Sequence, residues 1–91
     1  MLSFAMIFVL YVTPEYDGLL QESLTRAYPA KHLKVTPGLY FVSGGNATTK
    51  DVSDALGISD GPINYGLVAT IGSYYGRLPS HVWEWLSKNW Q

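Results

Sequence analysis

The chain has 91 residues, and we expect residues 1–91 to form a single domain around one core. Hydrophobic residues make up 47% and charged residues 14% of the chain, which excludes extended disorder. The formal net charge is −1 and the six Lys and Arg residues are scattered, which argues against a protein that grips nucleic acid through its phosphates. The absence of cysteine excludes a disulfide framework and a thiolate metal site.

Residues 4–12 form an uncharged apolar run in which both odd and even positions are apolar. The run is too short for a bilayer span, which needs about 20 apolar residues. It is also too uniform for a strand with one wet face, which would alternate apolar and polar residues. The run therefore predicts a strand buried on both faces. This chain's own helices would cover one face, and the C-terminal helix, a second copy or both would cover the other.

The segment that follows this strand has the features of a helix start. Thr13 is placed to cap the helix and Pro14 to occupy its first position. The helix is predicted to run to about residue 28, and Pro29 ends it. Its predicted apolar stripe consists of Tyr16, Leu20, Leu24 and Ala27.

Two short β-prone runs come next, at residues 32–36 and 39–43. The Pro37-Gly38 pair between them is typical of a tight turn, because glycine supplies the positive φ that a type II turn needs. The two runs therefore predict a β-hairpin.

The spacing of Thr48 and Asp51 resembles a capping box and predicts the start of a second helix. This helix is expected to end at Gly57. Its inward residues are predicted to be Val52, Ala55 and Leu56.

A fourth strand is predicted at residues 66–73 and a last helix at residues 81–90, with Ser80 as its cap. In the strand, Leu67, Ala69 and Ile71 should share one face. The apolar stripe of the last helix is predicted to consist of Val82, Trp83, Leu86 and Trp90, whereas Trp85 is expected to point elsewhere.

The predicted order is β-α-β-β-α-β-α, whose first six elements have the ferredoxin-like, split βαβ pattern. The fold class is therefore α+β. The two crossovers place both helices on one face of a four-stranded antiparallel sheet, and an extra helix follows at the C-terminus. The apolar strand at residues 4–12 is then central in the sheet.

Aromatic residues are frequent in the last third of the chain. Such residues could anchor a protein interface, stack on nucleic-acid bases or simply fill the core, and the lack of interleaved basic residues favours the interface. The interface candidates are Tyr65, Tyr74, Tyr75, Trp83 and Trp85.

The charged residues give weaker evidence for a functional site than the aromatic residues do. The glycine-rich segment 43–50 joins a strand to a helix, but it lacks the Gly-Lys-Ser/Thr order of a phosphate loop. Asp51 and Asp54 are explained by capping and a wet helix face, and the two histidines lack metal-ligand spacing. We therefore expect no catalytic residue, metal or cofactor. The weak nucleic-acid or anion candidates are Lys31, His32, Lys34 and Lys50.

The apolar first strand, the segments 39–43, 48–52 and 67–71, and the Trp85-Leu86 pair together form a pattern. This pattern resembles the small ferredoxin-fold proteins related to the CRISPR adaptation endoribonuclease subunit, the VapD-type toxins and the SinR-like hypothetical proteins. The resemblance implies a homodimer formed across the sheets. In the nuclease members, an aspartate at the end of strand one holds the metal. Here Thr13-Pro14 follows the strand and Asp17 comes later, so the resemblance implies fold and dimer rather than chemistry.

The leading functional hypothesis is a non-enzymatic homodimer that works by protein contact. The resemblance suggests a phage or mobile-element regulator or inhibitor of a nucleic-acid-processing or defence system. The alternatives are a metal-dependent endoribonuclease or nucleic-acid-binding protein of the same superfamily, and an accessory subunit with no activity of its own. No basic residue precedes the apolar run, so we expect no signal peptide, no membrane association and a cytoplasmic location.

Overall fold

The computed structural model describes residues 6–90, and it contains one four-stranded antiparallel sheet. The central strand β1 (Ile7–Val12) pairs with β3 (Leu39–Ser43) on one side and with β4 (Gly66–Thr70) on the other. The outer strand β2 (His32–Thr36) pairs with β3, so the strand order is β2-β3-β1-β4. The predicted ferredoxin-like α+β topology is confirmed, with β1 in the centre.

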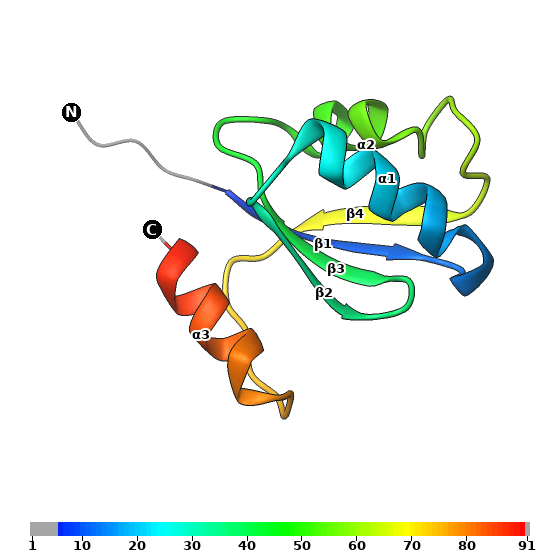
Figure 1. Ribbon diagram of the computed structural model, residues 1–91. Coiled ribbons are helices and arrows are strands. Elements are labelled where there is room, and N and C mark those ends of the chain that lie inside the picture. Colours follow the sequence, from blue (N-terminus) through cyan, green and yellow to red (C-terminus); the bar gives the residue numbers. More distant parts are fainter. Residues whose placement is uncertain (1–5, 91) are drawn as a thin grey trace.

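The helices lie on both sides of this sheet (Figure 1). Helices α1 (Asp17–Ala27) and α2 (Thr49–Leu56) cover one face, as the two crossovers predict. Helix α3 (Ser80–Asn89) lies against the opposite face, on the same chain. The predicted C-terminal helix therefore covers its own sheet.

The alternation of side chains along β1 creates two separate hydrophobic clusters. Phe8, Leu10 and Val12 point toward α1 and α2, where they join a fully buried core. Ile7 points the other way and is buried with Phe41 beneath α3. The expectation of a strand buried on both faces is confirmed on the side of α1 and α2, but on the other side Val9 is half-buried and Tyr11 is exposed. Phe4 and Ala5 of the predicted strand lie outside the described residues.

The first helix begins differently from the prediction. Thr13 occupies a cap position but its side chain makes no capping hydrogen bond. Pro14–Tyr16 form a turn of 3₁₀ helix, and α1 starts only at Asp17. Ala27 is exposed at the last position of α1 rather than part of the buried stripe.

The capping box of α2 is confirmed. The backbone N–H of Asp51 donates to Thr48 Oγ1 and that of Thr48 donates to Asp51 Oδ2, both at 3.0 Å. Gly57 ends the helix with a φ of 78°, the left-handed conformation that glycine adopts freely. The predicted inward position of Ala55 is wrong, since Ala55 is exposed and Ser53 is buried instead.

The last strand and helix are shorter or shifted relative to the prediction. Strand β4 ends at Thr70 instead of residue 73. Ser80 is the first residue of α3 and not its cap, a position that Pro79 takes. Trp85 was expected to point away from the core, but it packs against the cluster beneath α3.

Candidate interaction surface

Helix α3 covers only one end of its face of the sheet. At the other end five apolar residues, which we call the open face, lie side by side in the paired strands. Their side chains share the side of Ile7, because directly paired residues in a sheet point the same way. The open face consists of Val9, Tyr11, Leu39, Leu67 and Ala69, and at its border Val9 also packs against the cluster beneath α3.

The open face is accessible to solvent. Tyr11 is 48% exposed and Leu67, which pairs with it, is 60% exposed. Val9, Leu39 and Ala69 are half-buried. None of the five residues is charged, so the open face is an apolar surface without ionic groups. Uncharged apolar surface with a tyrosine is typical of the centre of protein interfaces.

The five predicted interface aromatics do not form one patch. Tyr74 stacks on Trp83 with ring centroids 5.6 Å apart, and it meets the edge of Trp90 at 5.1 Å. Trp83 and Trp85 are half-buried against the cluster beneath α3, so they serve packing. The contacts of Trp83 and Trp85 with this cluster therefore hold α3 against the sheet.

Tyr65 and Tyr75 are the most exposed of these candidates, ahead of Tyr74. Tyr65 precedes β4, whereas Tyr75 follows it. The whole of β4 lies between them in the chain. Tyr65 is two positions before Leu67 and therefore lies next to the open face in the sequence.

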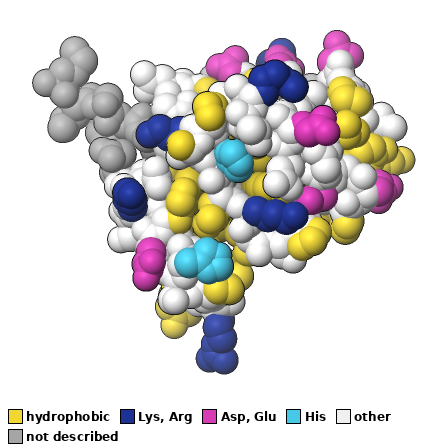
Figure 2. All heavy atoms as spheres, in the orientation of Figure 1, with side chains coloured by type: hydrophobic (Ala, Val, Ile, Leu, Met, Phe, Trp, Pro, Cys, Tyr) yellow, Lys and Arg dark blue, Asp and Glu magenta, His cyan; other side chains and the backbone are white. Residues whose placement is uncertain are grey.

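The four basic candidates also lie apart. Lys31, His32 and Lys34 lie at the β2 edge, whereas Lys50 lies on α2, which packs over β4 at the opposite edge. Lys50 Nζ is 2.7 Å from Asp54 Oδ2, and the Nδ1 of His32 is 2.8 Å from the carbonyl oxygen of Tyr28. Figure 2 shows basic and acidic side chains interspersed on the face it presents. Such a mixed surface offers no continuous track for phosphates.

A polar network around Asp17 connects the start of α1 to the β2–β3 hairpin. The backbone N–H of Gly38 and the hydroxyl of Tyr40 both donate to Asp17 Oδ1, at 2.8 and 2.9 Å. Lys34 Nζ donates to Asp17 Oδ2 at 2.9 Å. The carboxylate is thus engaged on both oxygens by groups of its own chain, which explains its position after the 3₁₀ turn.

The network changes the acidity of both ionisable partners. Burial alone would raise the pKa of Asp17, but the hydrogen bonds from Lys34, Gly38 and Tyr40 together lower it below its usual value. Burial and the neighbouring carboxylate raise the pKa of Tyr40, whose side chain is completely buried. Asp17 is therefore ionised and Tyr40 is neutral near neutral pH.

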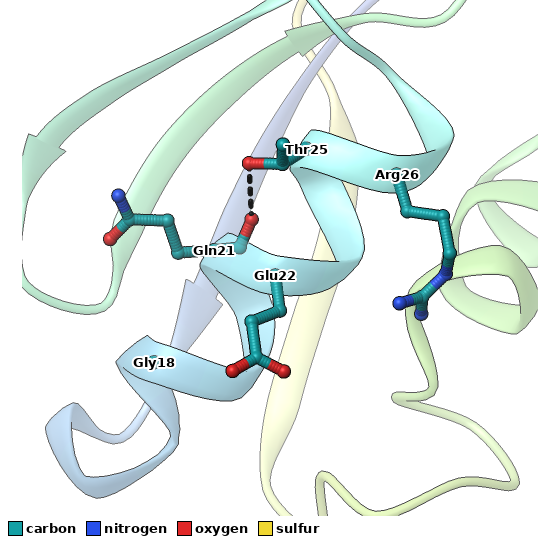
Figure 3. A pocket seen from close by; sticks show the side chains of 5 residues that line it. All are labelled: Gly18, Gln21, Glu22, Thr25 and Arg26. Atoms are coloured by element: carbon teal, nitrogen blue, oxygen red, sulfur yellow. Dashed lines mark hydrogen bonds between the residues drawn. The ribbon is translucent and has the colours of Figure 1, made fainter.

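The hollows on the surface of the described residues include one on α1 and one beside β4. The larger, of about 490 Å³, is lined by Gly18, Gln21, Glu22, Thr25 and Arg26 (Figure 3). All five belong to α1, so this hollow is a concavity on the outside of one helix. The hydroxyl of Thr25 donates to the carbonyl oxygen of Gln21 at 2.9 Å and is engaged within the helix.

The second hollow, of about 330 Å³, lies between α2 and β4. Thr49, Lys50 and Ser53 line it from α2. Ile58, Ser59 and residues 66–68 complete it, so it runs beside the outer edge of the sheet.

Within residues 6–90, no group of three or more His, Asp or Glu side chains is placed to hold a metal ion. No helix in the same range is long and apolar enough to cross a membrane. Comparison of the sequence and structure with models of protein families, with curated proteins and with solved structures found no match.

Sequence reasoning missed the surface that the structure exposes. It predicted apolar residues on both faces of β1 and placed Leu67 on one face of β4, but it did not bring Tyr11 and Leu67 together. The antiparallel register does so by pairing Tyr11 with Leu67. Two signals were available in the sequence. Val9 and Tyr11 are alternate residues of one strand, as Leu67 and Ala69 are of the other, so each pair lies on one face of the sheet. The last helix is also too short to cover the whole sheet.

Proposed function

We propose that the protein is a non-enzymatic homodimer that acts by contact with another protein. The observation that carries this proposal is the open face, where Tyr11 and Leu67 stand exposed beside each other with no charged residue among them. Leaving such apolar area in water costs about 25 cal/mol per Å², so a partner that covers it gains free energy. Helix α3 leaves this end of the sheet uncovered.

The sheet of a single copy offers little area for a protein partner. Strands spaced by about 4.8 Å, with about 3.4 Å per residue, give this four-stranded sheet a face of roughly 320 Å². Helix α3 covers part of that area. A stable protein interface buries about 800 Å² per partner, so one open face is too small. Two copies that place their open faces next to each other would offer a larger continuous surface.

The biological role rests on the resemblance alone and stays a prediction. That role is a phage or mobile-element regulator or inhibitor of a nucleic-acid-processing or defence system. The cytoplasmic location also stays a prediction.

The rival hypothesis of a metal-dependent endoribonuclease receives less support. Asp17, the first aspartate after the end of β1, accepts hydrogen bonds from Lys34, Gly38 and Tyr40. A metal ion would have to displace these donors.

Light scattering after size exclusion, at micromolar protein concentration, tests the dimer. A dimer should have twice the chain mass of 10.1 kDa. A monomer at every concentration would contradict the homodimer. The second arm incubates the protein with labelled RNA or DNA and Mg²⁺ or Mn²⁺. We expect no cleavage, and cleavage that disappears in a folded Asp17→Asn variant would favour the endoribonuclease.

A further inference from the structure

The two edges of the sheet differ in how they are protected against pairing with another strand. Exposed edges in native proteins usually carry lysine, a bulge or a proline that prevents such pairing. The β2 edge has all three, because Lys31 and Lys34 lie along it, its register with β3 shifts between Lys34 and Thr36, and Pro37 follows directly. The β2 edge is therefore blocked.

The β4 edge has none of these features. Residues 62–76 contain no charged side chain, and β4 itself contains no proline. Its register with β1 is continuous from Gly66 to Thr70, with no bulge. In Figure 1, β4 is the outer strand beneath α2. An unprotected, uncharged edge is a template for an added strand.

The hydrogen-bond pattern shows which backbone groups of β4 are free to bind that strand. The N–H of Ile71 donates to the carbonyl oxygen of Ile7, the residue opposite it in register, at 2.9 Å. In an antiparallel pair, such bonded positions alternate with non-bonded ones. Leu67 and Ala69 are therefore bonded to β1. The N–H and C=O groups of Gly66, Val68 and Thr70 point outward from the sheet.

We propose that β4 pairs antiparallel with β4 of a second copy, so that two four-stranded sheets become one continuous sheet. With a two-fold axis at Val68, the outward groups of Gly66 meet those of Thr70 in the second copy. On the open face, Leu67 then lies opposite Ala69 of the second copy, a large side chain beside a small one. This inference rests on the proposed homodimer and specifies its interface.

The chemistry of the edge favours a second copy over a charged peptide. The segment 62–76 is neutral, and Lys50, which lines the hollow beside it, is paired with Asp54, so two copies meet without net repulsion. A charged peptide finds no opposite charge on β4 itself. The hollow of about 330 Å³ beside Gly66–Val68 leaves room for side chains of the added strand on the helix side. On the other side, the pairing makes the two open faces adjacent and provides the larger surface that the proposed function needs.

A proline at position 70 tests the pairing. Thr70 is exposed and its N–H points outward, so Thr70→Pro removes a donor of the interface without breaking a bond to β1. By symmetry two hydrogen bonds are lost, each worth about 1 kcal/mol, and the dissociation constant should rise about 30-fold. Thr70→Ala is the matched control, because it removes the side chain but keeps the N–H, and it should leave the dimer intact.

Amide hydrogen exchange supplies a measurement that does not depend on a variant. In the dimer the amides of Gly66, Val68 and Thr70 should exchange slowly, and dilution to the monomer should make them fast. Leu67 and Ala69 should stay slow in both states, because they are bonded to β1.

The outcomes separate this inference from the proposed function. A wild-type dimer that weakens with Thr70→Pro and has slow outward amides supports the edge pairing. A wild-type dimer whose outward amides stay fast, and which Thr70→Pro leaves unchanged, overturns the edge pairing but leaves the homodimer standing. A wild-type monomer at every concentration overturns both.

Discussion

Replacing Asp17 with alanine should lower the free energy of unfolding by more than a substitution at the surface of a helix usually does. The change removes the acceptor for the buried Tyr40 hydroxyl and for the N–H of the buried Gly38. It also removes the ion pair with Lys34, whose side chain is 40% exposed.

The magnitude follows from these three contacts. A hydrogen bond to a charged group contributes about 1.5 kcal/mol or more, so the bonds to Gly38 and Tyr40 together contribute about 3 kcal/mol. The ion pair with Lys34 adds about 0.5 kcal/mol or less, because water screens it. Gln21 Oε1 lies 3.4 Å from the Tyr40 hydroxyl and offers only a weak replacement. We expect a loss of about 3 kcal/mol, which is a large share of the 5–15 kcal/mol typical of a small domain.

Urea unfolding followed by circular dichroism measures this loss, and the pH dependence identifies its cause. The pKa of Asp17 is lowered in the folded state, so its contribution is complete above the unfolded pKa of about 3.9. The contribution disappears as the pH falls through the folded pKa. The stability gap between wild type and Asp17→Asn should therefore be constant from about pH 5 to 7 and should close below about pH 4.

A double-mutant cycle between Asp17→Ala and Tyr40→Phe isolates the buried hydrogen bond. We expect a coupling free energy of about 1 kcal/mol or more. Lys34→Met serves as the control that removes only the exposed ion pair. If Asp17→Ala cost no more than Lys34→Met, or if the coupling were zero, the carboxylate would not connect α1 to the hairpin and the reasoning would be refuted.

Two further predictions concern the core and the hairpin turn. Phe8→Asp buries a charge in the core beneath α1 and should unfold the chain, whereas Tyr11→Asp on the open face should stay folded by circular dichroism. Gly38→Ala should cost about 2 kcal/mol or more in urea unfolding, because φ is +86° and the new Cβ would collide with the carbonyl oxygen of Val12. Gly45→Ala, with a φ of +62° and open space around it, should cost about 1 kcal/mol.

Each of these predictions has a clear contrary result. A folded Phe8→Asp variant would mean that this side chain is not in the core. If Gly38→Ala and Gly45→Ala lowered the free energy of unfolding equally, Gly38 would lie further from the carbonyl oxygen of Val12 than it does in the structure.

Local signals were enough to predict most of the fold. The capping box at Thr48 and Asp51 and the Pro-Gly turn each depend on residues a few positions apart, and so does the uniform apolarity of β1. The order of elements then implied the ferredoxin-like sheet, because the chirality and spacing of the crossovers leave few alternatives. The helix ends were less predictable. Thr13 has the right residue type for a cap, but a 3₁₀ turn follows it and its hydroxyl makes no capping hydrogen bond.

The candidate surface and the Asp17 network could not be predicted in the same way, because both depend on contacts between distant residues. Asp17 meets Gly38 and Tyr40, which lie 21 and 23 positions further along the chain. Tyr11 meets Leu67 only through the register of β1 with β4. Nothing in the local pattern around Trp85 shows that it packs inward, since a helix stripe predicts a direction only when the position of the sheet is known.

The separation of the two hydrophobic clusters has a consequence for folding cooperativity. The cluster beneath α3 shares no buried residue with the larger core beneath α1 and α2, and α3 follows the last strand. The C-terminal segment can therefore detach in a sub-global opening while the βαββαβ unit stays folded. Such an opening would uncover Ile7 and Phe41 and extend the open face across the whole sheet. The opening that lets the α3 amides exchange should accordingly cost less free energy than the opening that lets the β1 amides exchange.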